Sequence, residues 1–159
     1  MKISIRKGFG FGLTSGIITT LGLIIGLSSG TNSKIVVLAG IFVIAIADAL
    51  SDALGIHISE EAGSKSTTPR EVWESTISTF IFKFVFAMIF IIPVLLLTLQ
   101  NAVLVSAVVG LILIAVFSYH IAKQNETNPT LAVAEHILIT VVVIIATHFV
   151  GKWIATLTI

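Results

Sequence analysis

Five long apolar stretches constrain the fold of this chain more than any other feature of its sequence. Short polar segments separate them, and the helices that we expect cover about residues 8–29, 35–58, 69–99 with a short polar start, 102–122 and 131–154. A helix of about 20 apolar residues can cross the hydrocarbon core of a bilayer, and helices satisfy their own backbone polar groups in lipid. We therefore expect an all-α integral membrane protein in which five transmembrane helices form one domain over residues 1–159.

The composition supports this class. Hydrophobic residues make up 56% of 159 and charged residues 11%, and the mean hydropathy is +1.11. The expected partner is therefore the lipid bilayer, and the net charge of +1 gives no nucleic-acid signature. The absence of cysteine excludes disulfides and thiolate ligands, so any metal site uses oxygen, nitrogen or methionine sulfur. No nucleophile, base and orienting group recur at a usable spacing, so we do not expect an enzyme.

Glycines recur every fourth residue in the first stretch and form two ridges of small residues. The pairs that define these ridges are Gly12 with Gly16 and Gly22 with Gly26. Small residues at this spacing let another helix backbone approach closely, which is a main source of helix association in bilayers. The sequence leaves open whether the ridges pack inside the chain or against a second copy in a dimer.

Two carboxylates interrupt the second stretch. Asp48 and Asp52 lie four residues apart, so a helix places both on one face, together with Ser51 and Ser59. One charged Asp at the centre of a membrane helix costs about 2.5 to 3.5 kcal/mol on insertion scales. Since the two carboxylates repel each other, the pair is expected to share a proton or to bind a positive ion.

Residues 59–76 form the one extended polar segment. Glu60 and Glu61 lie at the end of the second helix, and Thr68 is expected to form a capping box with Glu71 at the start of the third. For Glu71 and Glu74 we favour a role at the helix start over metal binding, because acids there complement the helix dipole.

The third stretch contains Lys83 and Pro93. Pro93 is expected to kink the helix and to free a carbonyl, because proline removes a backbone hydrogen bond. For Lys83 we expect the ammonium to reach the membrane surface, with its stem in lipid, rather than to act as a counter-ion for the aspartates. The histidines on apolar helices are expected to be hydrogen-bonded packing residues rather than ligands.

The basic residues indicate the orientation of the helices. With the N-terminus inside, only Lys34 and Lys152 lie outside, and the inner side carries Lys2, Arg6, Lys7, Lys65, Arg70 and Lys123. The positive-inside rule therefore predicts a cytoplasmic N-terminus and a C-terminus outside. Residues 59–76 are then cytoplasmic, and we expect a multi-pass protein of the cell membrane.

Four segments together resemble one known family. They are GLTSGIITTLGLIIGLSSG, the second stretch ending ALSDALGIHIS, then FAMIFIIPVLL, and finally ATHFVGKWI. In order and spacing they are similar to the vacuolar iron transporter family, which carries ferrous iron and manganese. The resemblance implies five membrane helices per subunit, a homodimer, and a metal path between subunits lined by the first two helices. It also implies exchange of metal for protons, with iron or manganese as substrate and no resident cofactor.

The chain departs from the family pattern at several positions. Phe11 stands where the family usually has an Asp, Asp52 where it often has a Met, and Ile56 where it has a Glu. The long acidic cytoplasmic helices of the family are reduced here to residues 59–76. The resemblance therefore indicates a divergent member that shares the fold and has different coordinating residues.

The leading hypothesis from these patterns is a proton-coupled transporter for a divalent metal such as iron or manganese. Asp48 and Asp52 form its site within the membrane, and Glu60 and Glu61 form a cytoplasmic access route. Weaker candidates for metal contact are Ser51, Ser59, Glu71 and Glu74. In a symmetric dimer four carboxylates would converge, an oxygen site suited to such ions.

Two alternatives remain open. The first is transport of monovalent cations or protons by the same carboxylates. The second is a membrane scaffold that transports nothing, in which the aspartates pair with Lys83 or bind polar groups between helices.

Overall fold

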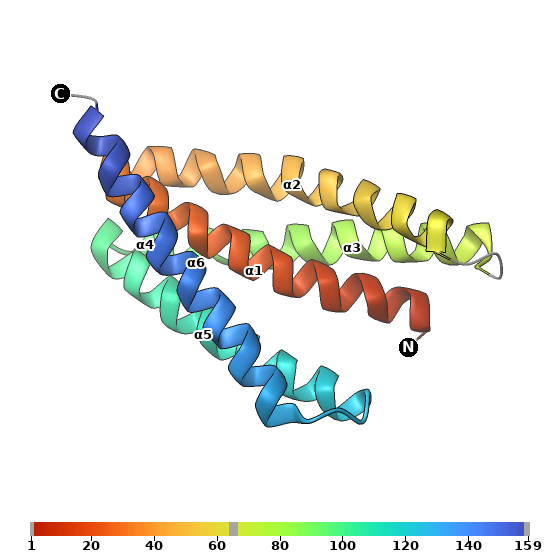
Figure 1. Cartoon of the computed structure of the whole chain (residues 1–159). Coiled ribbons are helices and arrows are strands. Elements are labelled where there is room, and N and C mark those ends of the chain that lie inside the picture. Colours follow the sequence, from red (N-terminus) through yellow and green to blue (C-terminus); the bar gives the residue numbers. More distant parts are fainter. Residues whose placement is uncertain (1, 64–66, 158–159) are drawn as a thin grey trace. The chain divides into compact units, whose positions relative to one another are not determined.

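The computed structural model describes residues 2–63 and 67–157, and over these residues the regular secondary structure is entirely helical (Figure 1). The helices are α1 (Ile3–Thr31), α2 (Lys34–Gly63), α3 (Pro69–Ile89), α4 (Ile91–Leu96), α5 (Leu99–Gln124) and α6 (Pro129–Leu157). With α3 and α4 taken together as Pro69–Leu96, five helical spans are long and apolar enough to cross a membrane. The predicted fold class is confirmed at this level.

Four of the helical spans are longer than expected, and the third is shorter, since it ends at Leu96 rather than near residue 99. α1 begins at Ile3 rather than near residue 8, and α2 continues to Gly63 rather than ending near residue 58. An apolar stretch marks only the part of a helix that suits lipid, whereas the backbone hydrogen bonds continue into the polar flanks. Lys65, which contributed to the predicted orientation, lies outside the described residues, and the orientation stays a prediction.

The helix is broken just before Pro93, where a kink was expected. α3 ends at Ile89 and α4 begins at Ile91. Ile89 lies four residues before Pro93, so its carbonyl is the one that loses its partner and meets the proline ring. At the other end of α4, the Lys34 ammonium donates hydrogen bonds of 2.9 Å to the carbonyls of Leu95 and Leu97. These bonds satisfy carbonyls that a helix C-terminus leaves free.

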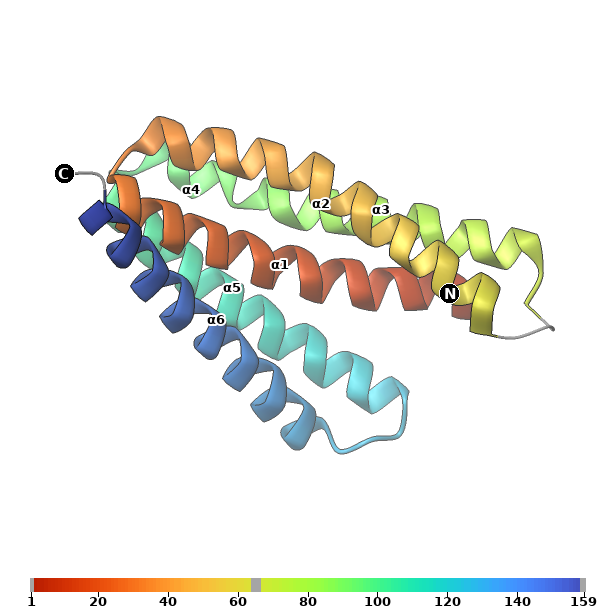
Figure 2. The ribbon, with the colours of Figure 1, turned by 45° about the horizontal axis from the view of Figure 1, so that its top comes forward.

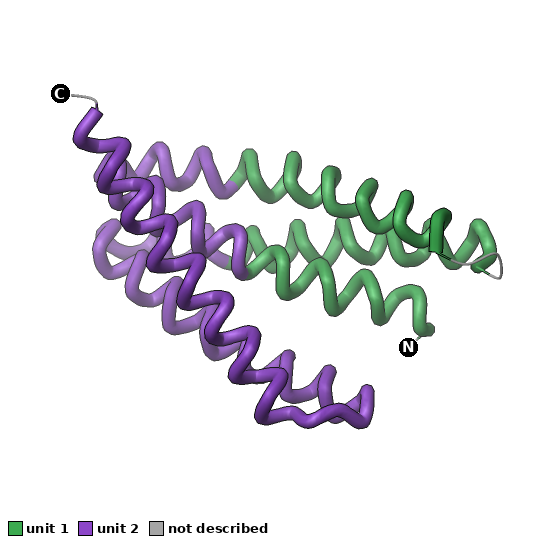
Figure 3. The backbone as a smooth tube through the Cα atoms, viewed as in Figure 1, with its two compact units in different colours: residues 1–17, 42–89 green, residues 18–41, 90–159 purple. Residues whose placement is uncertain are grey.

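The described chain divides into two compact units, which Figure 3 shows in green and purple. Unit 1 contains residues 1–17 and 42–89, and unit 2 contains residues 18–41 and 90–159. α1 and α2 each contribute one part to unit 1 and one part to unit 2. The expectation of one transmembrane domain over the whole chain stays a prediction.

In unit 1 the first glycine ridge packs against α3. A Cβ atom added at Gly12 would lie 2.7 Å from the carbonyl oxygen of Thr79 and 2.9 Å from the backbone nitrogen of Lys83. One added at Gly16 would lie 2.9 Å from the Lys83 carbonyl oxygen. The hydroxyl of Ser75 also donates a hydrogen bond to the Ser4 carbonyl. The backbones of α1 and α3 are therefore in close contact, as small-residue ridges allow.

In unit 2 the second ridge packs against α6. A Cβ atom added at Gly22 would lie 2.9 Å from Val143 Cγ1, and one added at Gly26 would lie 3.4 Å from the Thr147 carbonyl oxygen. α5 and α6 form a hairpin and lie side by side in Figures 1 and 2. Asn128 begins α6 by accepting hydrogen bonds from two backbone N–H groups, those of residues 130 and 131.

The outer faces of the helices are apolar. Large exposed side chains include Leu54 on α2, Ile112 on α5 and Phe149 on α6, each more than half exposed. Soluble monomers rarely expose apolar patches on this scale, and apolar side chains are the ones that lipid accommodates. These faces are therefore where the protein contacts the bilayer.

We predict that Gly12→Ala destabilises the protein by about 1–3 kcal/mol, because the added methyl group meets backbone atoms that cannot move independently. Gly63→Ala is the control, since a Cβ atom there has nothing within 4 Å. Gly63→Ala should leave the stability unchanged or raise it by up to about 1 kcal/mol, because Ala favours the helix over Gly by this amount. Thermal unfolding in detergent, followed by circular dichroism, measures both. Equal effects of the two substitutions would contradict close packing at Gly12.

Candidate functional site

The two aspartates of α2 meet a lysine of α3 inside unit 1. The ammonium nitrogen of Lys83 lies 2.5 Å from Asp48 Oδ2 and also forms an ion pair with Asp52 Oδ2. Ser15 of α1 completes the arrangement: its hydroxyl accepts a hydrogen bond from Lys83 at 2.9 Å and donates one to Asp52 Oδ2 at 2.8 Å. We refer to Lys83, Asp48 and Asp52 as the charged triad.

Burial differs between the two signs of charge. Lys83 is 1% exposed, whereas the side chains of Asp48 and Asp52 are 30% and 23% exposed. The aspartate side chains are therefore partly exposed, although Asp48 Oδ2 itself is buried, while the lysine is enclosed. Asp48 Oδ2 has no hydrogen bond, although it lies within ion-pair distance of Lys83. Charge rather than hydrogen-bond geometry therefore holds Asp48.

The expectation that Lys83 reaches the membrane surface is wrong. α3 buries one stripe of residues at four-residue spacing, namely Ser75, Thr79, Lys83 and Ala87. Lys83 is thus on the inner face of α3, where two carboxylates offset the cost of removing its charge from water. The signal in the sequence was this stripe of small and polar residues, into which Lys83 falls by helical spacing.

The acids at the polar end of α2 have basic partners. The Lys7 ammonium donates hydrogen bonds of 3.0 Å to both carboxylate oxygens of Glu60. Glu61 lies 3.4 Å from His57 Nε2, and its side chain is 62% exposed. Glu60 is more enclosed, with 16% of its side chain exposed. The negative charge at this end of α2 is therefore partly neutralised by Lys7 and His57 of the same chain.

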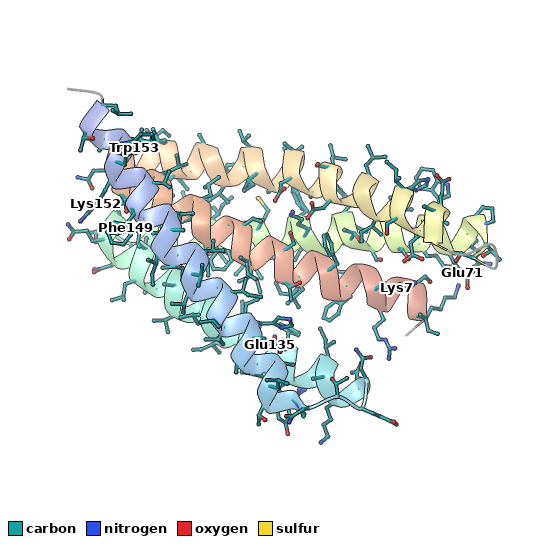
Figure 4. All side chains as sticks on the ribbon, viewed as in Figure 1. Lys7, Glu71, Glu135, Phe149, Lys152 and Trp153 are labelled. Carbon is teal, nitrogen blue, oxygen red and sulfur yellow. The ribbon has the colours of Figure 1, made fainter. Side chains whose placement is uncertain are left out.

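The acids at the start of α3 have structural roles. Glu71 and Thr68 exchange the hydrogen bonds of the expected capping box, which is confirmed. Glu74 pairs with Lys2 at 2.5 Å and with Arg70 at 3.0 Å, and it accepts a hydrogen bond from Ser4. Figure 4 shows Lys7 and Glu71 at this polar end of unit 1. The contacts of Glu74 with Lys2 and Ser4 hold the start of α1 against α3.

The candidate metal ligands do not gather within one subunit. Over residues 2–63 and 67–157, no group of three His, Cys, Asp or Glu side chains is placed to hold a metal ion. Glu60 lies eight residues beyond Asp52 on the same helix, a rise of about 12 Å. Ser51 and Ser59 are on the exposed side of α2. A metal bound at the aspartates would need further ligands from water or from another subunit.

Two histidines of the apolar helices, His136 and His148, are hydrogen-bonded to hydroxyl groups, as expected. His136 Nδ1 lies 2.8 Å from the Ser118 hydroxyl, and His148 Nδ1 lies 2.7 Å from the Ser29 hydroxyl. Each contact joins two helices of unit 2. They account for these histidines as packing residues.

We predict that Lys83→Met lowers the free energy of unfolding by up to about 3–5 kcal/mol, the cost of leaving buried charges without their partner. The control is Lys7→Met, which removes an exposed ion pair with Glu60 and should cost about 0–1 kcal/mol. Chemical or thermal unfolding in detergent measures both. Similar losses for the two lysines would show that the triad is not a buried interaction.

A search of curated proteins found no match. The sequence model of the VIT family, in contrast, matches residues 52–152 of the 159 in this chain. The matched region contains Asp52 and Lys83 and covers the last part of α2, all of α3 to α5 and most of α6. Because this match covers more than half of the chain, and because five helices are suited to span a membrane, the chain belongs to the VIT family of membrane cation transporters.

Proposed function

We propose that this protein transports divalent metal cations, iron or manganese, and that Asp48 and Asp52 bind the cation within the membrane. The observation that carries the proposal is the pair of carboxylates one turn apart on α2, partly exposed on a span that is otherwise apolar. Carboxylate oxygens suit hard and borderline divalent ions. Ionisable groups inside a membrane span usually mark an ion pathway.

We further propose that a second copy of the chain covers this side of α2. Beside the aspartates runs an exposed stripe of small residues, Ala47, Ser51, Gly55 and Ser59. Small residues permit close helix contact in membranes, and lipid is a poor environment for partly exposed carboxylates. Two copies of α2 facing each other would bring four carboxylates together, which supplies the oxygen ligands that one subunit lacks.

Glu60 and Glu61 form the proposed access route from the cytoplasm. Glu61 is exposed and pairs only with a histidine, so it offers the more accessible carboxylate. Because carboxylates bind either a metal ion or protons, metal release in exchange for protons is the proposed coupling. The orientation rests on the basic residues of the inner side.

Two other functions are favoured by one specific observation, the ion pairing of Lys83 with both aspartates. The triad, with all groups ionised, has a net charge of −1, which matches one monovalent cation or proton per subunit. Alternatively the triad joins α1, α2 and α3 in a scaffold that transports nothing. Flux measurements separate these functions from divalent transport.

In liposomes containing the purified protein, we predict that the double variant Asp48→Asn, Asp52→Asn lowers Mn(II) flux at least about tenfold, because the intramembrane ligands lose their charge. The control is Glu135→Gln, which removes an exposed acid on α6 (Figure 4) and should leave the flux unchanged. Full flux in the double variant would refute the carboxylate site. Sodium flux without Mn(II) flux would favour monovalent transport, and absence of any flux would favour the scaffold.

The proposed dimer is testable by cross-linking, because the chain contains no cysteine. Ser51→Cys should give a disulfide-linked dimer on mild oxidation in native membranes, since the two copies of α2 would lie close together. Ile112→Cys, an exposed position on α5, is the matched control and should remain monomeric. Electrophoresis without reductant reads the result. Equal cross-linking at both positions would mean random collision rather than a dimer through α2.

A further inference from the structure

Lys83 is the largest side chain among the fully buried residues described. It places a positive charge at the site in unit 1 that is proposed to bind cations, and the proposed function does not explain this charge. We propose that its ammonium is the resident cation of the Asp48 and Asp52 pair, and that a divalent metal binds there by displacing it. This inference rests on the proposed function of the two aspartates as the cation site. It assigns to Lys83 the control of metal affinity.

The geometry places the ammonium where a metal ion would be bound. Lys83 Nζ is surrounded by three oxygens from two helices: Oδ2 of Asp48, Oδ2 of Asp52 and the hydroxyl of Ser15. Oxygens of the same two carboxylates are those a metal would use. An ammonium and a metal ion cannot both occupy that position, so the two cations compete for the same atoms.

Charge explains how Lys83 would control the affinity for a metal. The two carboxylates carry −2, and a divalent ion that takes the place of the ammonium neutralises them. The displaced ammonium stays tethered to α3 and is left without its carboxylates. Unpaired charge is costly in membrane interiors, so metal binding carries this cost as long as Lys83 is present, and loses it when the charge of Lys83 is removed.

The local packing allows this exchange. The side chains of Asp48 and Asp52 are partly exposed, whereas Lys83 is enclosed and Asp48 Oδ2 is buried beside its ammonium. A metal ion can therefore meet the exposed parts of the two aspartates first. Lysine carries its charge on a flexible four-carbon stem, so rotation within that stem can move the ammonium away from the Oδ2 atoms. Gly16 has no side chain to obstruct that stem, whose Cγ lies 3.4 Å from the position of a Cβ added there.

The test is Mn(II) binding to the purified full chain in detergent, measured by the electron paramagnetic resonance signal of free Mn(II). Lys83→Met and Lys83→Gln should bind Mn(II) at least about tenfold more tightly than the parent chain. This size follows because one charge within about 4–6 Å changes the cation affinity of a carboxylate by about 10- to 1000-fold. Lys83→Arg keeps the charge and should resemble the parent chain.

The controls exclude other causes of tighter Mn(II) binding. Lys123→Met removes an exposed lysine near the end of α5 and should leave the affinity unchanged. Adding Asp52→Asn to Lys83→Gln should abolish the gain, because the gain depends on the carboxylate pair. If the Lys83 variants do not fold alone, purification in millimolar MnCl₂ should restore them, since the metal takes the place of the ammonium.

Folded Lys83→Met and Lys83→Gln proteins that bind Mn(II) no more tightly than the parent chain would overturn this inference. Failure of MnCl₂ to restore unfolded variants would overturn it as well. The proposed function fails separately, when the parent chain shows no Mn(II) flux. Tighter binding in the variants without flux in the parent chain would support the role of Lys83 and refute divalent transport.

Discussion

The ion pairs of Lys83 with Asp48 and Asp52 are the interaction on which unit 1 depends. Three charges lie in spans that are otherwise apolar, and each of them is costly there without the others. Buried ion pairs often add little net stability compared with apolar residues of the same size, but removal of one partner is costly. The triad therefore acts mainly as a constraint: it requires the faces of α2 and α3 that carry these residues to meet.

The first glycine ridge lets α1 pack closely beside the contact between α2 and α3. Because Gly12 and Gly16 have no side chains, the backbone of α1 approaches α3 beside Lys83. That approach places the Ser15 hydroxyl between the ammonium and Asp52. The polar contact and the close backbone packing thus support each other. In lipid, where apolar burial gives little drive for helix association, packing and polar contacts of this kind hold helices together.

Apart from the triad, the ion pairs of the described residues lie at one end of unit 1. Glu60 has Lys7, and Glu74 has Lys2 and Arg70. These exposed pairs contribute little energy individually. The triad differs because its ammonium is enclosed while its aspartate side chains are partly exposed. That asymmetry, rather than the number of acids, makes the aspartates of α2 the candidate site for a cation.

The sequence by itself determined every feature that depends on neighbours along the chain. The five helical spans, the capping box of Thr68 and Glu71, the interruption before Pro93 and the shared face of Asp48 and Asp52 follow from helical spacing and backbone chemistry. Only the tertiary structure decided which faces meet. Helical periodicity indicates which residues share a face and not what that face contacts, so Lys83 was expected at the membrane surface. Its pairing with Asp48 and Asp52 depends on the packing of α2 against α3, which no local pattern in either helix specifies.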